Sequence, residues 1–317
     1  MFRKLIVPLD GSSLAEQALG TASAIARACN AEVELLLVHN GASFNGIAHG
    51  STAGAPEEHI YVQGIAQEVA SRFSIAVTTH VAPGIPVEAI VRRVRETAAD
   101  LIVMTSHGRT GFSRAWLGSV ADGVVRESTI PVLIERPVEG RKWRTSGIPP
   151  FHRVLIPLDG SPMSAAVLRP AIDLCRWLEA RPILARVVLP ATIDLTDAGV
   201  PLYPPAIVDE EGTRHYVNQA QDQLTELSLA LEADTRILAE TEVAVGNNVA
   251  ATIIDVARRR RADLIAMSTH SRGPSRLLLG SVTDKVLRGT QLPILVLHPS
   301  PTAVVPEDRM ARAAGTG

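Results

Sequence analysis

Short, fully apolar runs alternate along the chain with longer segments whose apolar residues recur every three to four positions. The short runs are typical of strands buried on both faces of a sheet, and the longer segments are typical of helices that cover such a sheet. Strands are predicted over 5–9, 33–38, 75–81, 101–104 and 131–135, with helices over 15–25, 57–73, 87–99 and from 119 onward. This alternation predicts an α/β protein with a parallel, doubly wound sheet.

The whole pattern occurs twice. The turn Pro8–Gly11 recurs 149 positions later as Pro157–Gly160, and Gly118 recurs 162 positions later as Gly280. His107 recurs as His270 after 163 positions, so the second copy has 14 (163 − 149) more residues before this point and one fewer after it. We expect the addition around 190–211. The sequence therefore predicts two tandem domains, 1–137 and 152–299, joined by a linker, 138–151, and followed by a disordered tail, 300–317.

Composition narrows the class of protein. Of 317 residues, 46% are hydrophobic and 3% aromatic, which predicts aliphatic cores, and the net charge of −2 gives no general attraction to nucleic acid or anionic membrane. Cys29 and Cys175 have neither zinc-ligand nor redox-motif spacing. No apolar run approaches 18 residues, and no secretion signal is recognised, so we expect no membrane span and a cytoplasmic protein.

The stretch 101–119 carries the most specific chemistry. An apolar strand leads into a loop rich in Gly, Ser, Thr and Arg, and the loop ends where a helix begins at Gly118-Ser119. The first amides of a helix have no intrahelical partner, and the helix dipole places partial positive charge there, so this arrangement favours an anion. A phosphate-bearing ligand is predicted. The glycines and basic residues around the loop are Gly108, Gly111, Gly118, His107, Arg109 and Arg114.

These residues carry a resemblance to a known family. The runs Val7-Pro8-Leu9-Asp10-Gly11-Ser12, Ser106-His107-Gly108-Arg109-Thr110-Gly111 and Leu117-Gly118-Ser119, followed by 131–134, resemble the universal stress proteins. The resemblance covers 2–136 and 152–298, so the chain is similar to a tandem universal stress protein. It implies two five-stranded sheets in the order 3-2-1-4-5 and, for one subgroup of the family, binding of ATP.

The family's phosphate motif is Gly, two residues, Gly, nine residues, Gly, then Ser or Thr. Gly108, Gly118 and Ser119 match its last three elements, and Thr105 stands in place of its first Gly. The resemblance implies that Asp10 and Val38 hold the adenosine end, and that Gly108, Gly118, Ser119 and the amide of Val120 hold the phosphates together with Mg²⁺. In a sheet of this order, strands one and four meet at the switch point where ligands bind, which agrees independently.

The candidate site therefore has two copies, without an assigned catalytic residue or protein metal ligand. In the first half its members are Pro8, Leu9, Asp10, Val38, Met104, Thr105, His107, Gly108, Arg109, Gly118, Ser119 and Val120. In the second half they are Pro157, Asp159, Val187, Met267, Ser268, His270, Ser271, Gly280, Ser281 and Val282. We expect the second site to be weaker because Ser268 and Ser271 replace glycines and the loop is shorter.

Plainer interpretations stay open for several features. Asp10 could simply begin a turn, and His107 and His270 favour backbone packing or phosphate contact over catalysis. The run 258–261 ends a helix, where cations complement the dipole, which favours a solvated face over a nucleic-acid site.

Three functions remain: a nucleotide-binding regulatory module, which is the leading hypothesis; a slow ATP hydrolase or phosphotransferase; and a ligand-free structural stress protein. The resemblance also implies that the edge strands 131–135 and 293–297 pair within one chain, and it allows two chains to form a homodimer.

Overall fold

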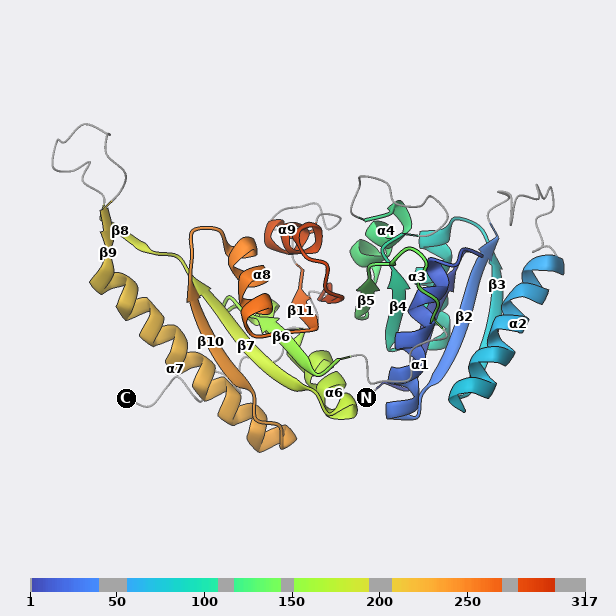
Figure 1. The fold of residues 1–317 in the computed structure, drawn as a ribbon, viewed down its shortest axis with the longest axis horizontal. Helices are drawn as coiled ribbons and strands as arrows, with labels where there is room; N and C mark the ends of the chain where they lie inside the picture. The colour runs from blue at the N-terminus through green and yellow to red at the C-terminus, as the bar shows by residue number, and fades with distance from the viewer. Residues whose placement is uncertain are drawn as a thin grey trace.

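The protein is described from a computed structural model, which covers residues 2–39, 56–107, 117–143, 151–193, 207–269 and 279–299. Ten strands form one continuous sheet, with five from each half of the chain (Figure 1). Their order is β3-β2-β1-β4-β5 in the first half and β10-β7-β6-β11-β12 in the second. Both halves therefore have the predicted order 3-2-1-4-5 with parallel neighbours.

The first half alternates strands and helices as the apolar pattern predicts. Its elements are β1 Lys4–Leu9, η1 Ala15–Gln17, α1 Ala18–Cys29, β2 Glu32–His39, α2 Pro56–Phe73, β3 Val77–Pro83, α3 Pro86–Thr97, β4 Leu101–Thr105, α4 Ser119–Glu127 and β5 Val132–Glu135. Strand β3 begins two residues later than the sequence predicts, because Ser74 ends α2 in a left-handed conformation with φ 53°.

The second half repeats this plan with an addition. Its elements are β6 Arg153–Pro157, α5 Pro162–Ala165, α6 Leu168–Leu178, β7 Arg181–Val188, β8 Ala191–Ile193, β9 Ile207–Asp209, α7 Glu210–Thr235, β10 Glu240–Val245, α8 Val249–Arg259, β11 Leu264–Ser268, α9 Ser281–Gly289 and β12 Ile294–Leu297. Between β7 and β10 lie 14 more residues than between β2 and β3 (51 against 37). The described part of this addition forms an antiparallel hairpin, β8–β9, and a helix of 26 residues where α2 has 18.

Helices cover both faces of the sheet. In the first half α1 and α2 pack on one face and α3 and α4 on the other; α6 and α7, then α8 and α9, repeat this in the second half (Figure 1). The cluster under α1, α2, α6 and α7 runs through both halves, and α1 contacts α6. The two halves therefore share a core.

The fifth strands join the halves. Strands β5 and β12 pair antiparallel, with Leu133 opposite Leu295, which confirms the predicted pairing within one chain. The Arg136 side chain also donates to the carbonyl of Arg288 at the end of α9 (3.3 Å). Because each edge covers the other, only β3 and β10 remain as edges of the ten-stranded sheet. Association of two chains stays a prediction.

Part of the predicted linker packs on the first half. The Gln17 amide group makes two hydrogen bonds with the backbone of Val138, both of 2.8 Å. Trp143 is 2% exposed, and its ring centroid lies 6.3 Å from that of Phe73. The described residues after β5 therefore extend the core of the first half.

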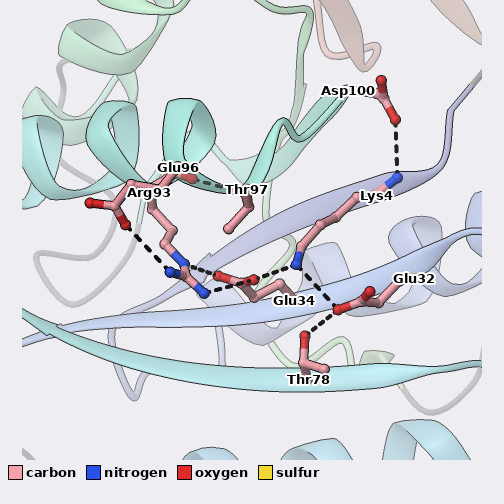
Figure 2. A network of polar contacts seen from close by, with 8 residues as sticks. All are labelled: Lys4, Glu32, Glu34, Thr78, Arg93, Glu96, Thr97 and Asp100. Carbon is pink, nitrogen blue, oxygen red and sulfur yellow. Dashed lines mark hydrogen bonds and ion pairs between the residues drawn. The ribbon is translucent and has the colours of Figure 1, made fainter.

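In the first half, a polar network connects residues near the amino-terminal ends of the strands, away from their carboxyl ends (Figure 2). Glu34 is 1% exposed and accepts from Lys4 Nζ at 2.8 Å and from Arg93 Nε at 2.5 Å. Burial alone would raise the pKa of Glu34, but the hydrogen bonds from Arg93 and Lys4 outweigh burial and lower it. Asp100 continues the network by accepting from the amide of Lys4.

Candidate functional site

The candidate site lies at the carboxyl ends of β1 and β4, where the strand order reverses. These two strands pair in parallel, with Leu5 opposite Leu101 and Ile6 opposite Ile102. Asp10 directly follows β1, and Ser106 and His107 directly follow β4. The next strand, β2, contributes Val38, which packs against the cluster under α3 and α4. The topology thus brings these predicted residues to one edge of the sheet.

Asp10 organises the turn after β1. Its Oδ1 accepts from the amide (3.0 Å) and the hydroxyl (2.6 Å) of Ser12, and Ser12 Oγ in turn accepts from the amide of Ala15. Gly11 has φ 83°, a conformation that side chains with a Cβ rarely adopt. Asp10 therefore does begin a turn, as the simpler interpretation predicts. The hydrogen bonds of this turn hold its carboxylate at the carboxyl end of β1.

The residues after β4 form a second tight turn. Thr105 Oγ1 donates to the carbonyl of His107 (2.8 Å), and Ser106 Oγ lies 3.1 Å from His107 Nδ1. The hydroxyl of Thr105, which replaces the first glycine of the family motif, is thus used by the backbone of its own turn. His107 is 9% exposed, which fits the packing role weighed from the sequence.

Gly118 closes the loop onto this turn. Its amide donates to the carbonyl of Ser106 (2.8 Å), and a Cβ at Gly118 would lie 3.0 Å from that oxygen. Any other residue would therefore crowd the carbonyl of Ser106, although φ −66° is open to all residues. Gly108 and Arg109 lie outside the described residues, so their predicted roles stay predictions.

Helix α4 presents an uncapped start beside this turn. Gly118 occupies the N-cap, and no described side chain bonds to the first amides. Ser119 is exposed and Val120 is half-buried. The acid in the first turn, Asp122, is bound by both Nε and a terminal nitrogen of Arg126, each at 2.8 Å. The start of α4 therefore keeps the partial positive charge that suits an anion.

Three more of the predicted residues lie in the strands that lead into these turns. Pro8 is half-buried near the end of β1, and Leu9 and Met104 are buried on β1 and β4. These residues therefore position the turns that follow them.

The second half repeats the first turn closely. Pro157 ends β6, and Asp159 Oδ1 accepts from the amide (2.9 Å) and hydroxyl (2.6 Å) of Ser161. Gly160 has φ 84°, as Gly11 has φ 83°. Val187 lies near the end of β7, level with Val38 of the first half.

The second loop is built differently. The amide of Gly280 donates to the side-chain Oγ1 of Thr269 (2.9 Å) instead of to a backbone carbonyl. Thr283 Oγ1 donates to the carbonyl of Ser268 (3.1 Å), and Ser268 Oγ lies 3.4 Å from the carbonyl of Ser164. Hydroxyls that could have faced a phosphate are therefore used inside the protein.

The other predicted members of the second site fall into two groups. Met267 is buried near the end of β11. Ser281 and Val282 begin α9, whose N-cap residue, Gly280, has no side chain to cap the first amides of the helix. His270 and Ser271 lie outside the described residues.

Sequence reasoning missed a buried pair beside the first site. His39 Nδ1, at the end of β2, lies 3.0 Å from both carboxylate oxygens of Glu58 in the first turn of α2. The two side chains are 3% and 2% exposed. The pair fixes the end of β2, and therefore Val38, to α2. In the sequence, the pair is indicated only by Glu58 in the first turn of the helix that follows β2.

The basic run 258–261 is not a free cationic patch. Arg258 pairs with Asp255 (3.3 Å), Arg259 with Glu242 (3.3 Å), and Arg260 with both Glu240 and Glu242. The Arg258 pair lies within α8, whereas the pairs of Arg259 and Arg260 connect the end of α8 to β10.

The described ranges contain neither an exposed thiol nor a cluster of metal-binding side chains. Cys29 and Cys175 are free and buried, and burial raises the pKa of both thiols, to about 12 for Cys175. The described residues contain no group of three His, Cys, Asp or Glu side chains that could hold a metal. Among the helices that the structure describes, none combines the length and apolar character needed to cross a membrane.

Comparisons with known proteins agree with this architecture. A universal stress protein of Methanocaldococcus jannaschii is 32% identical over 139 residues, which covers 42% of this chain and 82% of that protein. A universal stress protein of Mycobacterium tuberculosis is 26% identical over 205 residues, or 64% of this chain and 63% of the relative. The crystal structure of a universal stress protein from Archaeoglobus fulgidus shares the fold, with a TM-score of 0.64, 18% identity, and coverage of 94% of this chain and 98% of that one.

The family model described as the Universal stress protein family matches residues 1–136 and again 150–298. With two copies of the 3-2-1-4-5 sheet in one chain, the protein belongs to the universal stress protein family as a tandem, two-domain member.

Proposed function

We propose that the first half binds an adenine nucleotide, ATP with Mg²⁺, at the carboxyl ends of β1 and β4, and that the chain acts as a nucleotide-dependent regulatory module. The observation that carries this proposal is the uncapped start of α4 at Gly118, held against the turn after β4 by the bond from its amide to the carbonyl of Ser106. Membership of a family with an ATP-binding subgroup supports it.

Each part of the ligand meets suitable chemistry. The amides at the start of α4 and the glycine N-cap suit phosphate oxygens, because a backbone without a Cβ allows close approach and the helix dipole favours negative charge. The Ser119 hydroxyl is the group that would reach a phosphate-bound Mg²⁺. At the other end, Asp10 would accept from ribose hydroxyls and Val38 would contact the adenine. Binding and orientation are the roles of these side chains, and we assign none of them a catalytic step.

A charge placed at Ser119 tests the site without weakening the fold. Ser119 is exposed at the first position of α4, where an acid stabilises the helix. Two unit charges about 8 Å apart, at an effective dielectric constant of about 20, repel by about 2 kcal/mol. Ser119→Glu should therefore weaken ATP binding about 30-fold in calorimetry, while the melting temperature without ligand stays equal or rises.

Matched variants make the result specific. Ser119→Gln has the same shape without the charge and should bind ATP nearly as the parent does. Ser281→Glu places the same charge at the equivalent position of α9 and should leave the tighter ATP site intact. If Ser119→Glu binds ATP as tightly as Ser119→Gln, the phosphates do not lie at the start of α4 and the proposal is wrong.

A further inference from the structure

A half-buried cation distinguishes the second candidate site from the first. Arg186 lies near the carboxyl end of β7, directly before Val187. The equivalent residue of the first half, 149 positions earlier, is Leu37, which is fully buried in the core. The second half therefore carries a guanidinium where the first half has an aliphatic side chain.

The contacts of Arg186 place its guanidinium at the turn after β6. One terminal nitrogen donates to Oε1 of Gln223 on α7. The other lies so close to Gly160 that a Cβ built on that glycine would be 2.4 Å away. The charged group is thus held against the Asp159–Gly160 turn, which corresponds to the Asp10–Gly11 turn of the first site.

The described residues satisfy only part of the guanidinium. Its Nε is buried and has no hydrogen-bond partner among the described residues. Burial lowers the pKa of Arg186, and the charge of Asp159 opposes this, so the group is a partly desolvated cation with one acidic neighbour. An arginine has five donors in a planar fork that matches phosphate oxygens, and a buried donor without an acceptor costs stability. An anion beside the guanidinium of Arg186 would supply the missing hydrogen-bond acceptor.

We propose that the second half binds an adenine nucleotide that carries an additional phosphate on its ribose, and that Arg186 contacts this phosphate. The inference rests on the proposed function, from which it takes that the Asp159 turn faces the ribose. In the doubly wound dinucleotide-binding fold an acid beside the ribose accepts from its free hydroxyl, whereas a nearby arginine accommodates a phosphate on the ribose. Arg186 also offsets the charge of Asp159, which would otherwise repel that group.

The loop after β11 is consistent with this change of specificity. In the second half, hydroxyls of Thr269 and Thr283 hold the start of α9. The second loop also has Ser268 and Ser271 in place of glycines of the family motif. A site that we expect to hold a phosphate chain less tightly, and that has an added cation beside the ribose, favours a ligand with charge on the ribose.

The test compares ligands that differ only at the ribose. The full chain with Ser119→Glu, in which the first site is weakened, is titrated by calorimetry with AMP, adenosine 2′,5′-bisphosphate and adenosine 3′,5′-bisphosphate. At least one bisphosphate should bind 10-fold or more tightly than AMP, and the preferred isomer identifies the ribose position. Arg186→Leu, which restores the first-half residue, should remove this preference, and Arg186→Lys should keep part of it.

Two outcomes would overturn the inference. One is equal affinity for AMP and both bisphosphates; the other is a preference that survives in Arg186→Leu. If that variant is unfolded by circular dichroism, Arg186→Gln replaces it and the same comparison decides. ATP binding by the parent chain is measured in parallel. Its absence would refute the proposed function, whereas normal ATP binding without an Arg186-dependent preference would refute only this inference.

Discussion

Glu135 makes the stability of the first half sensitive to pH near neutrality. It ends β5, is 8% exposed, and accepts a hydrogen bond from the Thr21 hydroxyl on α1. Burial raises the pKa of this carboxyl from 4.5 to about 7, and Thr21 and then Arg141 counter the effect only in part. The second half has no carboxyl at this place, because Leu297 and Pro170 occupy the equivalent positions.

The direction of the pH effect follows from the raised pKa. Between the unfolded value of 4.5 and about 7, the folded chain holds a proton that the unfolded chain has released. The contribution of Glu135 is therefore complete below the unfolded pKa and is lost as pH rises through the folded pKa. At 1.36 kcal/mol for each unit, the whole shift corresponds to about 3 kcal/mol. Most of this, roughly 2 to 3 kcal/mol, should be lost between about pH 5 and pH 8.

Glu135→Gln isolates this effect, because the amide oxygen can still accept from Thr21 but cannot ionise. We expect the variant to match the parent within about 1 kcal/mol at pH 5 and to exceed it by roughly 2 to 3 kcal/mol at pH 8. Urea unfolding at the two pH values, followed by tryptophan fluorescence to which buried Trp143 contributes, measures the difference. Glu139→Gln, at an exposed position four residues later, is the control and should change neither value. An equal pH dependence in parent and Glu135→Gln would refute the reasoning.

Three further predictions concern the ion network, the two sites and the joined edges. Glu34→Gln leaves Lys4 and Arg93 facing a neutral group in a buried position. Urea unfolding should show a free energy of unfolding lower by about 3–5 kcal/mol, whereas Glu57→Gln, at an exposed position, should change it little. Gly118→Val should abolish the tighter ATP site in calorimetry while Gly280→Val leaves it, and the reverse result would show that the second site is the stronger. Leu295→Pro removes an amide from β12 and should split thermal unfolding into two calorimetric transitions, whereas one transition with unchanged heat would contradict the role of β5–β12 pairing.

Much of the framework could be predicted because it depends on local patterns. Apolar runs as short as Leu101–Thr105 identify buried parallel strands, and the repeated Asp-Gly turns identify where β1 and β6 end. The pairing of β5 with β12 was predicted from the family resemblance, and it agrees with the general need to cover exposed edge strands. The same patterns placed the candidate site at the switch point.

Other features depend on contacts between distant residues. Strands β8 and β9 have three residues each, too few to show an alternating pattern, so the hairpin was invisible in the sequence. Trp143 lies in a segment rich in Gly and charge, and its packing is evident only from contacts with distant residues such as Phe73. Thr105 looked like a defect of the glycine motif until its hydroxyl was found to bond to the carbonyl of His107.

The two halves differ most informatively in which strand residues carry a charge. Glu34 of the first half corresponds to Ile183 of the second, and Leu37 corresponds to Arg186. A buried charge persists only when something compensates it. Lys4 and Arg93 compensate Glu34 within the protein, so its role is structural. The Nε of Arg186 has no acceptor among the described residues although it stands at the ligand-facing end of the sheet. Because its compensation is incomplete there, the difference between Leu37 and Arg186 is better explained by a difference in ligand than by a difference in folding.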